Sequence, residues 1–347
     1  MKTQIIHLDR NHIDEALAKR AGTLLAAGGV VAIPTETVYG LGASAYDVDA
    51  VHRVFAAKGR PSDNPLIVHV ADKEMVYELA TEVSAQAKLV MQHFWPGPIS
   101  IIVKKSDRIP DVISAGLDTV AIRMPSHPVA LSVIRYAGIP VAAPSANLSG
   151  KPSPTTAAHV VHDLMGKIDM IVDGGDCLVG LESTVLDVSG GTPVILRPGG
   201  ISAQQLRAVL GEVDAPPVIG DVTGVPKCPG MKYKHYAPEA EVHVIEYVGE
   251  FPENELRCLV VQAHEKNRRV GVLSDDQMGN IVNADVWLFA GNTSEEYAAH
   301  LFDSLRSFDL QGTDLVYCPI SFADGLGVAI RNRLYKAAAG RIHKLNR

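Results

Sequence analysis

The chain has 347 residues, of which 47% are hydrophobic and 20% are charged, and its formal net charge is −7. These proportions describe a well-packed globular protein and exclude a disordered or fibrous chain. The length exceeds that of one average domain and predicts two. The acidic balance argues against broad electrostatic binding to nucleic acid or anionic membranes, so we expect functional cations to be concentrated in a pocket.

The four cysteines, which are Cys177, Cys228, Cys258 and Cys318, are far apart in the sequence. Because they form no C-x-x-C pair, they indicate neither a zinc ribbon nor a disulfide framework, and a reducing compartment is favoured. No apolar run reaches the length of about 18 residues that predicts a membrane-spanning helix. The first residues also lack the apolar core of a secretory signal, so we expect a cytoplasmic protein.

The first 210 residues alternate between helical and strand patterns. An amphipathic helix is expected at 14–27, a buried strand at 30–33 and a second helix at 47–57. Then follow strand 66–70, helices 73–80 and 84–94, strands 99–103 and 119–123, helix 128–136, strand 139–142, helix 155–165, strands 170–172, 184–188 and 194–196, and helix 203–210. This mixture predicts an α/β fold with a twisted, mixed, open sheet flanked by helices. No G-x-G-x-x-G follows the first strand, which disfavours a nicotinamide-binding unit.

The regular pattern stops between residues 212 and 240, where prolines and glycines gather. A connection of this length is typical of a disordered tether or of a functional lid. The remaining pattern predicts strands at 241–245, 270–273, 286–289 and 315–317 and helices at 295–307 and 326–339. We therefore predict a first domain at 1–212, a linker or lid at 213–240, and a smaller Rossmann-like α/β domain with a parallel sheet at 241–347.

A lysine and an arginine flank a glycine where the helix 47–57 is expected to end. Gly59 and Pro61 predict that the backbone leaves the helix there, so Lys58 and Arg60 can converge on one polyanion. The planar arginine fork and the compact lysine charge together suit a triphosphate. The alternative is that both are ordinary helix-end cations that complement the macrodipole.

Four polar turns follow or precede expected strands, and α/β proteins bind ligands at the carboxyl ends of their strands. The turns are PTETVYGLG at 34–42, APSANLSG at 143–150, GLESTV at 180–185 and LRPG at 196–199. Taken singly, each is more typical of turn chemistry than of a binding site. A further segment, FWPGP at 94–98, is interpreted as a rigid structural turn.

Taken together, these segments resemble the threonylcarbamoyl-adenylate synthases of the YrdC-like fold, in the long form with an appended C-terminal domain. The basic pair described above matches the K-x-R signature, and Ser145 and Asn147 match the S-x-N signature. The segment 34–41 matches the threonine-pocket turn, and PGMKYKHYAP at 229–238 matches the linker signature of the long form. The resemblance covers essentially the whole chain and is weakest over the last hundred residues.

The resemblance implies a nucleotidyltransferase that joins L-threonine, bicarbonate and ATP into threonylcarbamoyl-AMP and pyrophosphate. This reaction is the first step in making N6-threonylcarbamoyladenosine in tRNA. Charge accumulates on the α-phosphate and on the leaving pyrophosphate, so fixed cations should be the main catalytic device. Mg²⁺ is implied as a cofactor that is held mainly by the ATP phosphates. The tRNA threonylcarbamoyl-transferase complex is the implied recipient of the product, with weak or no direct tRNA binding and no membrane association.

The family's sites carry over to this sequence motif by motif. Catalysis is assigned to Lys58 and Arg60. L-threonine binding is assigned to Thr35, His69, Arg123, Ala143 and Ser183. ATP binding is assigned to Lys58, Ser62, Thr119, Ser145, Asn147, Ser153, Arg197, His235 and Tyr236. The linker that carries the last two residues is expected to shield labile intermediates from water, with a passive tether as the alternative.

Several of these residues also have a purely structural interpretation. Arg123 could belong to a buried ion pair, and His69 lies within an apolar strand, where a core histidine is common. Ser153 and Thr119 could be helix-cap or strand-edge groups. We also expect that replacing either catalytic cation with alanine leaves folding nearly unchanged, on the premise that both cations are exposed.

Two other functions are open at this stage. A double-stranded RNA or tRNA binding module would be expected to carry an extended basic stripe with interleaved aromatic residues, and the sequence has neither. A carbamoyltransferase of hydrogenase maturation would carry additional zinc-finger cysteines and an acylphosphatase-like domain, which this sequence also lacks.

Overall fold

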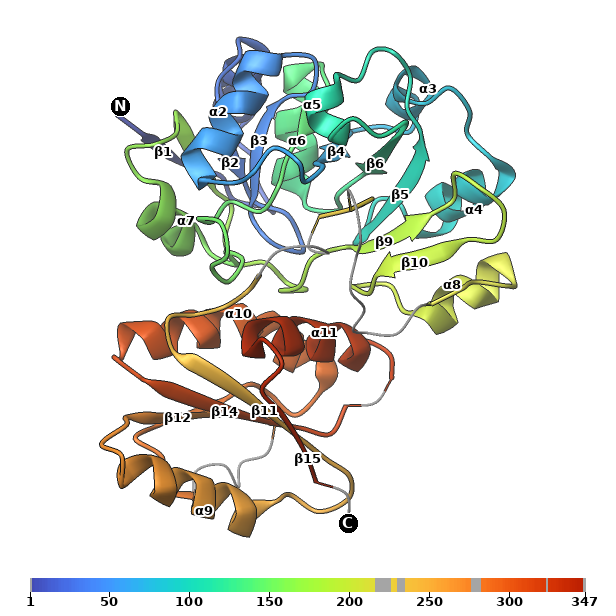
Figure 1. Cartoon of the computed structure of the whole chain (residues 1–347). Coiled ribbons are helices and arrows are strands. Elements are labelled where there is room, and N and C mark those ends of the chain that lie inside the picture. Colours follow the sequence, from blue (N-terminus) through green and yellow to red (C-terminus); the bar gives the residue numbers. More distant parts are fainter. Residues whose placement is uncertain (1, 216–225, 230–234, 276–281, 323, 346–347) are drawn as a thin grey trace. The chain divides into compact units, whose positions relative to one another are not determined.

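The chain forms two compact units in a computed structural model that describes residues 2–215, 226–229, 235–275, 282–322 and 324–345. The first unit comprises Met1–Ser149 and Ser153–Lys232, and the second comprises Gly150–Pro152 and Tyr233–Arg347. Figure 1 shows the elements of both units, coloured along the sequence. Among the described residues, no helix has both the length and the apolar character needed to cross a bilayer.

Ten strands of the first unit form one sheet. They are β1 (Gln4–His7), β2 (Val31–Ile33), β3 (Gly40–Ser44), β4 (Ile67–His69), β5 (Ile99–Lys104), β6 (Thr119–Arg123), β7 (Val141–Ala142), β8 (Met170–Asp173), β9 (Thr184–Asp187) and β10 (Val194–Arg197). Their order is β1-β8-β2-β3-β7-β4-β6-β5-β9-β10. The pairs β1·β8, β2·β8, β4·β6 and β5·β9 are parallel and the other pairs are antiparallel. The predicted mixed sheet is therefore confirmed.

Helices cover both faces of this sheet. They are α1 (Glu15–Ala26), α2 (Val48–Lys58), α3 (Met75–Leu79), α4 (Ala85–Phe94), α5 (Asp111–Ser114), α6 (Pro128–Ala137), α7 (Ala157–Leu164) and α8 (Ala203–Leu210). Successive side chains of a strand point to opposite faces. Val31 and Ile33 accordingly pack with α1 and α6, whereas Val30 and Ala32 pack with α2 and α7. The strand reads as a continuous apolar run because both of its faces are buried.

Helix α2 carries the basic pair to its place. The Asp47 side chain caps its first turn by accepting a hydrogen bond from the Ala50 N–H, and Gly59 ends it in the left-handed region at φ 61°. Lys58 is the last helical residue, and Arg60 follows the left-handed glycine. The predicted exit of the backbone at Gly59 is confirmed, and glycine suits it because a Cβ would disfavour this conformation.

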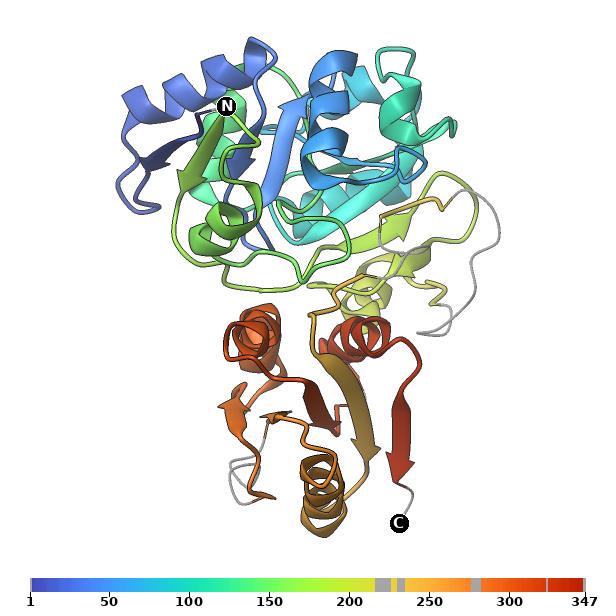
Figure 2. The same cartoon turned by 60° about the vertical axis from the view of Figure 1, so that its left-hand side comes forward.

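The second unit has a five-stranded sheet in which every pair is parallel, as the sequence predicted. Its elements are β11 (Glu241–Tyr247), α9 (Glu253–His264), β12 (Val270–Ser274), β13 (Val286–Phe289), α10 (Ser294–Leu310), β14 (Leu315–Ile320), α11 (Gly327–Ala338) and β15 (Ile342–Leu345). The strand order is β13-β12-β14-β11-β15. Figure 2 shows α9 on one face of this sheet and α10 and α11 on the other. Val270 and Val272 pack in the cluster that includes α9, while Gly271 faces Phe308 of α10.

Five elements were not predicted, namely β1, β3, β15, α5 and α9. Strand β3 has the sequence GLGAS, which resembles a turn, but its glycines serve close packing. A Cβ at Gly42 would lie 2.8 Å from Cγ1 of Val141, so the neighbouring strand leaves room for glycine alone. Helix α9 does carry a buried stripe of Leu256, Val260 and Ala263, whose spacing is typical of a helix.

Candidate active site

The side chains that were predicted to bind threonine gather where neighbouring strands begin or end. His69 is the last residue of β4 and Arg123 the last residue of β6, and the two are register partners in this parallel pair. Ala143 follows the end of β7, and Thr35 follows β2. Ser183 immediately precedes β9. His69 and Arg123 share one end of the parallel pair β4·β6, whereas Ala143 lies opposite Ile67 at the start of β4. The long side chain of Arg123 reaches the turn after β2.

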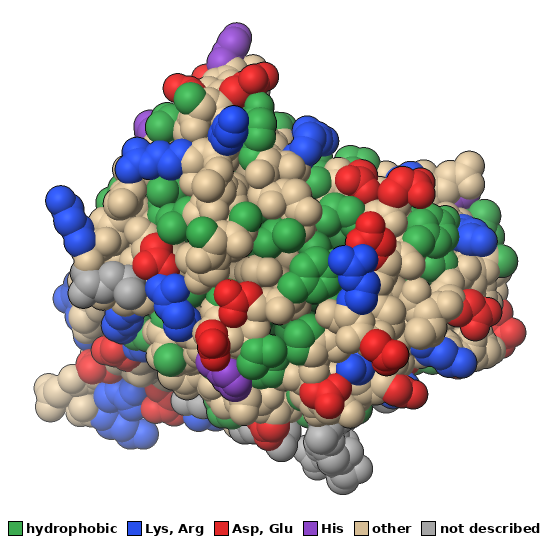
Figure 3. Space-filling model, turned by 90° about the horizontal axis from the view of Figure 1, so that it is seen from above, with side chains coloured by type: hydrophobic (Ala, Val, Ile, Leu, Met, Phe, Trp, Pro, Cys, Tyr) green, Lys and Arg blue, Asp and Glu red, His purple; other side chains and the backbone are tan. Residues whose placement is uncertain are grey.

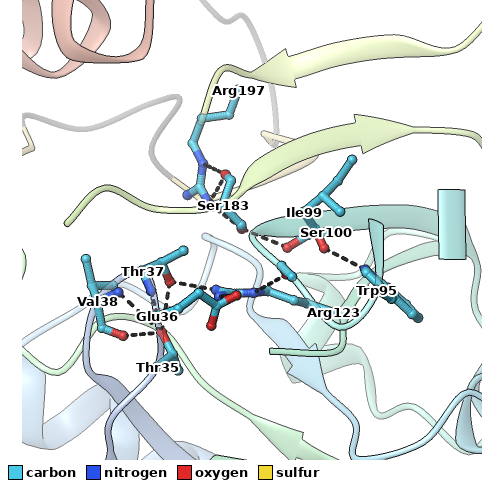
Figure 4. A network of polar contacts seen from close by, with 11 residues as sticks. Thr35, Glu36, Thr37, Val38, Trp95, Ile99, Ser100, Arg123, Ser183 and Arg197 are labelled. Atoms are coloured by element: carbon cyan, nitrogen blue, oxygen red, sulfur yellow. Dashed lines mark hydrogen bonds and ion pairs between the residues drawn. The ribbon is translucent and has the colours of Figure 1, made fainter. Parts of the chain in front are cut away.

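The guanidinium of Arg123 is buried and has partners on three sides. Its Nη2 lies 2.7 Å from Oε1 of Glu36, its Nη1 donates to Oγ1 of Thr37 at 2.8 Å, and its Nε donates to the Gly97 carbonyl at 3.3 Å. Figure 4 shows the arginine held among these groups. The buried ion pair that was considered as the alternative is therefore present, while threonine binding by Arg123 stays a prediction.

Thr35 organises the turn that carries Glu36. Its hydroxyl donates to the Val38 carbonyl at 2.6 Å and lies 2.9 Å from the Thr37 hydroxyl. The N–H groups of Thr37 and Val38 both donate to the same hydroxyl at 3.2 Å. These bonds fix the turn before any ligand arrives, so the threonine side chains serve turn chemistry as well as lining the site.

A second part of the network joins Ser183 to Arg197. Nε and Nη2 of Arg197 donate to the Ser183 carbonyl at 3.1 and 2.9 Å, and Nη1 donates to the Pro229 carbonyl at 3.2 Å. The Ser183 hydroxyl lies 2.9 Å from that of Ser100 on β5. Figure 4 shows this chain of contacts beside the arginine of β6. The two buried guanidinium groups are therefore held by fixed partners from several strands.

Lys58, Ser145 and Asn147 come together as the sequence predicted, but as a buried cluster. The Lys58 ammonium donates to the carbonyls of Ser145 and Asn147 at 2.6 and 2.5 Å and to Oδ1 of Asn147 at 3.3 Å. Only 3% of Lys58 is exposed. The premise that this cation is exposed is therefore wrong, because the segment after β7 surrounds its ammonium with acceptors. Its loss should affect folding as well as activity.

The other predicted nucleotide ligands are less closely connected. Arg60 is half-buried and its Nη2 donates to two carbonyls of its own loop at 3.2 Å, and Ser62 is exposed. Ser153 is buried and its hydroxyl donates to Oε1 of Glu182 at 2.5 Å. Thr119 begins β6 and is four residues from the ion-paired arginine at the other end, roughly 13 Å away at 3.3 Å per residue.

His235 and Tyr236 belong to the second unit. The Tyr236 ring stacks on Phe302 of α10 with the ring centroids 5.3 Å apart, and the Arg333 guanidinium lies 5.5 Å from its centroid. Within the predicted lid at 213–240, residues 216–225 and 230–234 are outside the described part of the chain. The shielding role of the linker therefore stays a prediction.

Burial and the nearby charges set the ionisation of this pocket. Burial lowers the pKa of His69 to about 3, and the positive charge of Arg123 acts in the same direction. Burial alone would raise the pKa of Glu36, but the charge and hydrogen bond of Arg123, together with backbone hydrogen bonds from Glu36 and Ser126, outweigh burial and lower the pKa. At neutral pH the pocket therefore contains a cation, an anion and a neutral imidazole.

Sequence reasoning missed three residues of these networks, namely Glu36, Ser100 and Glu182. Glu36 stands inside the quoted threonine-pocket turn, and a carboxylate flanked by buried hydroxyls could have been noticed there. Glu182 likewise lies within a quoted segment. Ser100 is a single polar residue within an apolar strand. This is a weak signal of a site, because isolated buried hydroxyls also occur in strands that have no such role.

The fold and the site together define a two-unit α/β protein with buried networks of charged and polar side chains at the strand ends of its larger sheet. Two family models match the chain: the one described as "Telomere recombination" over residues 23–199 and "Threonylcarbamoyl-AMP synthase, C-terminal domain" over residues 201–339. The chain is 45% identical to the threonylcarbamoyl-AMP synthase of Pyrococcus abyssi, covering 97% of this chain and 98% of that one. It is 49% identical to the Bacillus subtilis enzyme of the same name, over 93% of both chains.

A solved structure agrees with this relationship. The structure of Pyrococcus abyssi Sua5 complexed with L-threonine matches with a TM-score of 0.95 and 45% identity, over 99% of this chain and 100% of that one. The chain therefore belongs to the threonylcarbamoyl-AMP synthase family, and it is an enzyme of that family. The expectation from the sequence motifs is confirmed.

The face drawn in Figure 3 gives no support to the alternative of an RNA-binding module. On the face drawn in Figure 3, lysine and arginine side chains are scattered among aspartate and glutamate and form no continuous stripe. A protein that binds a nucleic-acid backbone needs its cations gathered along one path.

Proposed function

We propose that this chain makes threonylcarbamoyl-AMP and pyrophosphate from L-threonine, bicarbonate and ATP. The observation that carries this proposal is the match to threonylcarbamoyl-AMP synthases over nearly the full length, with their signature motifs forming buried, charged clusters. The reaction has two parts. The threonine amine first takes up carbon dioxide or bicarbonate to give a carbamate. A carbamate oxygen then attacks the α-phosphorus of ATP and pyrophosphate leaves, which makes the enzyme a nucleotidyltransferase.

Threonine would bind at the strand ends of the first sheet. We assign its carboxylate to the fork of Arg123, whose position is fixed by the bonds to Thr37 and Gly97. His69 is neutral at working pH, so it can exchange a hydrogen bond with the substrate hydroxyl without adding a charge. The backbone of Ala143 and the hydroxyls of Thr35 and Ser183 would complete this part of the site.

The nucleotide would bind beside the S-x-N segment. Lys58 holds the carbonyls of Ser145 and Asn147 and so brings a positive charge next to the hydroxyl and amide groups that suit phosphate and ribose. Arg60 and Arg197 are the other cations assigned to the phosphates, and Ser62, Thr119 and Ser153 are assigned as further ATP contacts. Preorganised cations stabilise the charge that develops on the α-phosphate and on pyrophosphate, and losing one such group typically costs about 10²–10³ in turnover.

Mg²⁺ would neutralise phosphate charge in this reaction. Within the described ranges, no three histidine, cysteine, aspartate or glutamate side chains are grouped so that they could hold a metal ion. This donor set suits a metal that arrives with ATP and is held mainly by phosphate oxygens. We propose no dedicated protein ligands for it.

We further propose that the product passes to a tRNA threonylcarbamoyl-transferase complex, because an acyl adenylate is labile and must be used quickly. This chain would then need little affinity of its own for tRNA. The structure places none of the four cysteines in a disulfide, as is usual for proteins of a reducing compartment, and we propose the cytoplasm as the place of reaction.

The test is pyrophosphate release by the purified full chain with ATP and Mg²⁺. We expect release that requires both L-threonine and bicarbonate and is much weaker with L-serine. Release without threonine, or no release at all, would contradict the proposal. A tRNA affinity that falls steeply with salt would support the RNA-binding alternative instead.

A further inference from the structure

The carboxylate of Glu36 is the anionic centre of the threonine pocket. Its side chain is 7% exposed, and Oε1 lies 2.7 Å from Nη2 of Arg123. Among the described residues Oε2 has no donor with good hydrogen-bond geometry, although the backbone N–H groups of Glu36 and Ser126 approach the carboxylate closely enough to lower its pKa. A buried polar atom without a donor is costly, so it is expected to gain a partner in the working state of the protein.

The pair of Glu36 and Arg123 matches the charges of an amino acid. A free amino acid carries a carboxylate and an ammonium group on the same carbon, and the two groups are neighbours in space. A carboxylate bound to the fork of Arg123 therefore brings the ammonium within reach of a carboxylate that is itself in contact with that arginine. Figure 4 shows the two side chains meeting beside the turn that fixes Glu36.

The ammonium group must lose a proton before it can react. Threonine ammonium and bicarbonate together give the carbamate, one water and one proton: the N–C bond forms, a C–O bond of bicarbonate breaks and the hydroxide leaves as water. We propose that Glu36 is the base that accepts the ammonium proton, on Oε2, so that the nitrogen lone pair becomes free to attack carbon. This inference rests on the proposed function and adds a catalytic residue to it.

Substrate binding itself should make Glu36 a better base. In the free protein Arg123 holds the pKa of Glu36 below its usual value. When the substrate carboxylate pairs with the same arginine, the attraction is shared and a second negative charge comes close. Both effects favour the protonated form of Glu36, as does its burial, while the substrate ammonium opposes them until its proton has been transferred. The base would thus gain strength only when the substrate is bound.

Other titratable groups face Glu36 from three directions. His69 at the end of β4 and His127 at the start of α6 both feel its charge, and burial lowers their pKa values to about 3 and about 4. Cys177 in the loop after β8 is buried, and its pKa is raised by burial and by the charge of Glu36. All three are therefore neutral at working pH, and Arg123 is the charged partner that sets the behaviour of Glu36.

The alternative is that Glu36 serves only as the structural counter-ion of Arg123. Glu36→Gln keeps the size of the side chain and removes the base, and Glu82→Gln on an exposed loop is the matched control. If Glu36 is the base, forward pyrophosphate release at pH 7 falls about 10²-fold, the usual contribution of a general base. As the pH is raised, the substrate amine deprotonates without help, so the loss of activity in Glu36→Gln shrinks about tenfold per pH unit. The KM for threonine stays the same or falls.

The reverse reaction separates the two roles. ATP formation from threonylcarbamoyl-AMP and pyrophosphate does not need the proton transfer, so Glu36→Gln should retain it within about twofold. An equal loss in both directions would overturn the inference in favour of a structural role. Forward activity equal to that of the wild type would overturn it as well.

The wild-type protein tests the inference without any variant, which matters if Glu36→Gln does not fold. At fixed bicarbonate, kcat/KM for threonine should be nearly flat between about pH 7 and the pKa of the free amine, because the ammonium form is used directly. A rise of about tenfold per pH unit would mean that only the free amine reacts and would overturn the inference. If the wild type releases no threonine-dependent pyrophosphate at all, the proposed function itself fails.

Discussion

Replacing Lys58 with methionine tests the buried cluster on both stability and activity. Methionine nearly preserves the volume but removes the ammonium, so the carbonyls of Ser145 and Asn147 lose this donor, while Oδ1 of Asn147 keeps the bond from the Ser145 hydroxyl. Each buried acceptor left without a donor destabilises the fold by about 1–3 kcal/mol. Part of this loss is offset, because the variant no longer buries a charge. We therefore expect the free energy of unfolding to fall by about 3 kcal/mol. Turnover should fall by about 10²–10³ in the protein that stays folded.

Urea denaturation gives the stability, and pyrophosphate release at a temperature where the variant is folded gives the activity. Lys19→Met on the exposed face of α1 is the matched control and should change neither quantity. An unfolding free energy within about 0.5 kcal/mol of the wild type would refute the energetic role of the cluster. Full turnover in a folded variant would refute the catalytic role of the cation.

Three further predictions concern the pocket and its frame. Arg123→Lys keeps the charge but loses the fork, so steady-state kinetics should show the KM for threonine raised by about tenfold or more, with the KM for ATP little changed. A Cβ at Gly199 would lie 2.3–2.4 Å from backbone atoms of residues 182–184. Gly199→Ala should therefore lower the free energy of unfolding, measured by urea denaturation, by about 2 kcal/mol. Gly190→Ala is the control and should be close to neutral, because a Cβ there meets nothing within 4 Å. Burial lowers the pKa values of His69 and His127 to about 3 and about 4. As the pH falls below about 6.5, these imidazoles therefore take up protons in the unfolded chain but not in the folded protein, which favours unfolding. Urea denaturation should accordingly show that the free energy of unfolding falls by about 2 kcal/mol per imidazole between pH 7 and pH 5. A free energy of unfolding that does not change over this pH range would contradict the burial of the two imidazoles as neutral groups.

Much of the fold could be predicted because the sheet strands are apolar runs bounded by turn residues. The parallel second sheet and the exit of α2 at Gly59 followed from periodicity and from glycine and proline signals. Strand β3 escaped because its glycines, which usually mark turns, are required by the close approach of β7. Strand β1 escaped because it lies at the sheet edge and only Ile6 is buried, which leaves no apolar run to detect.

The site was predicted unevenly for a physical reason. The motifs identified residues by type and order, and the structure joins Lys58 to Ser145 and Asn147 as that order implied. The sequence could not predict which buried charges form ion pairs with one another. Glu36 and Arg123 are far apart in the chain, and no local pattern predicts that β2 and β6 bring them within 2.7 Å.

The most direct test of the account follows the carbon of bicarbonate. The full chain is incubated with ¹³C-bicarbonate, L-threonine, ATP and Mg²⁺, and the adenylate product is identified by mass spectrometry and ¹³C NMR. The account predicts one labelled carbon in a carbamoyl group that joins threonine to AMP, formed together with an equal amount of pyrophosphate. An unlabelled threonyl adenylate, or pyrophosphate without any labelled adenylate, would contradict it.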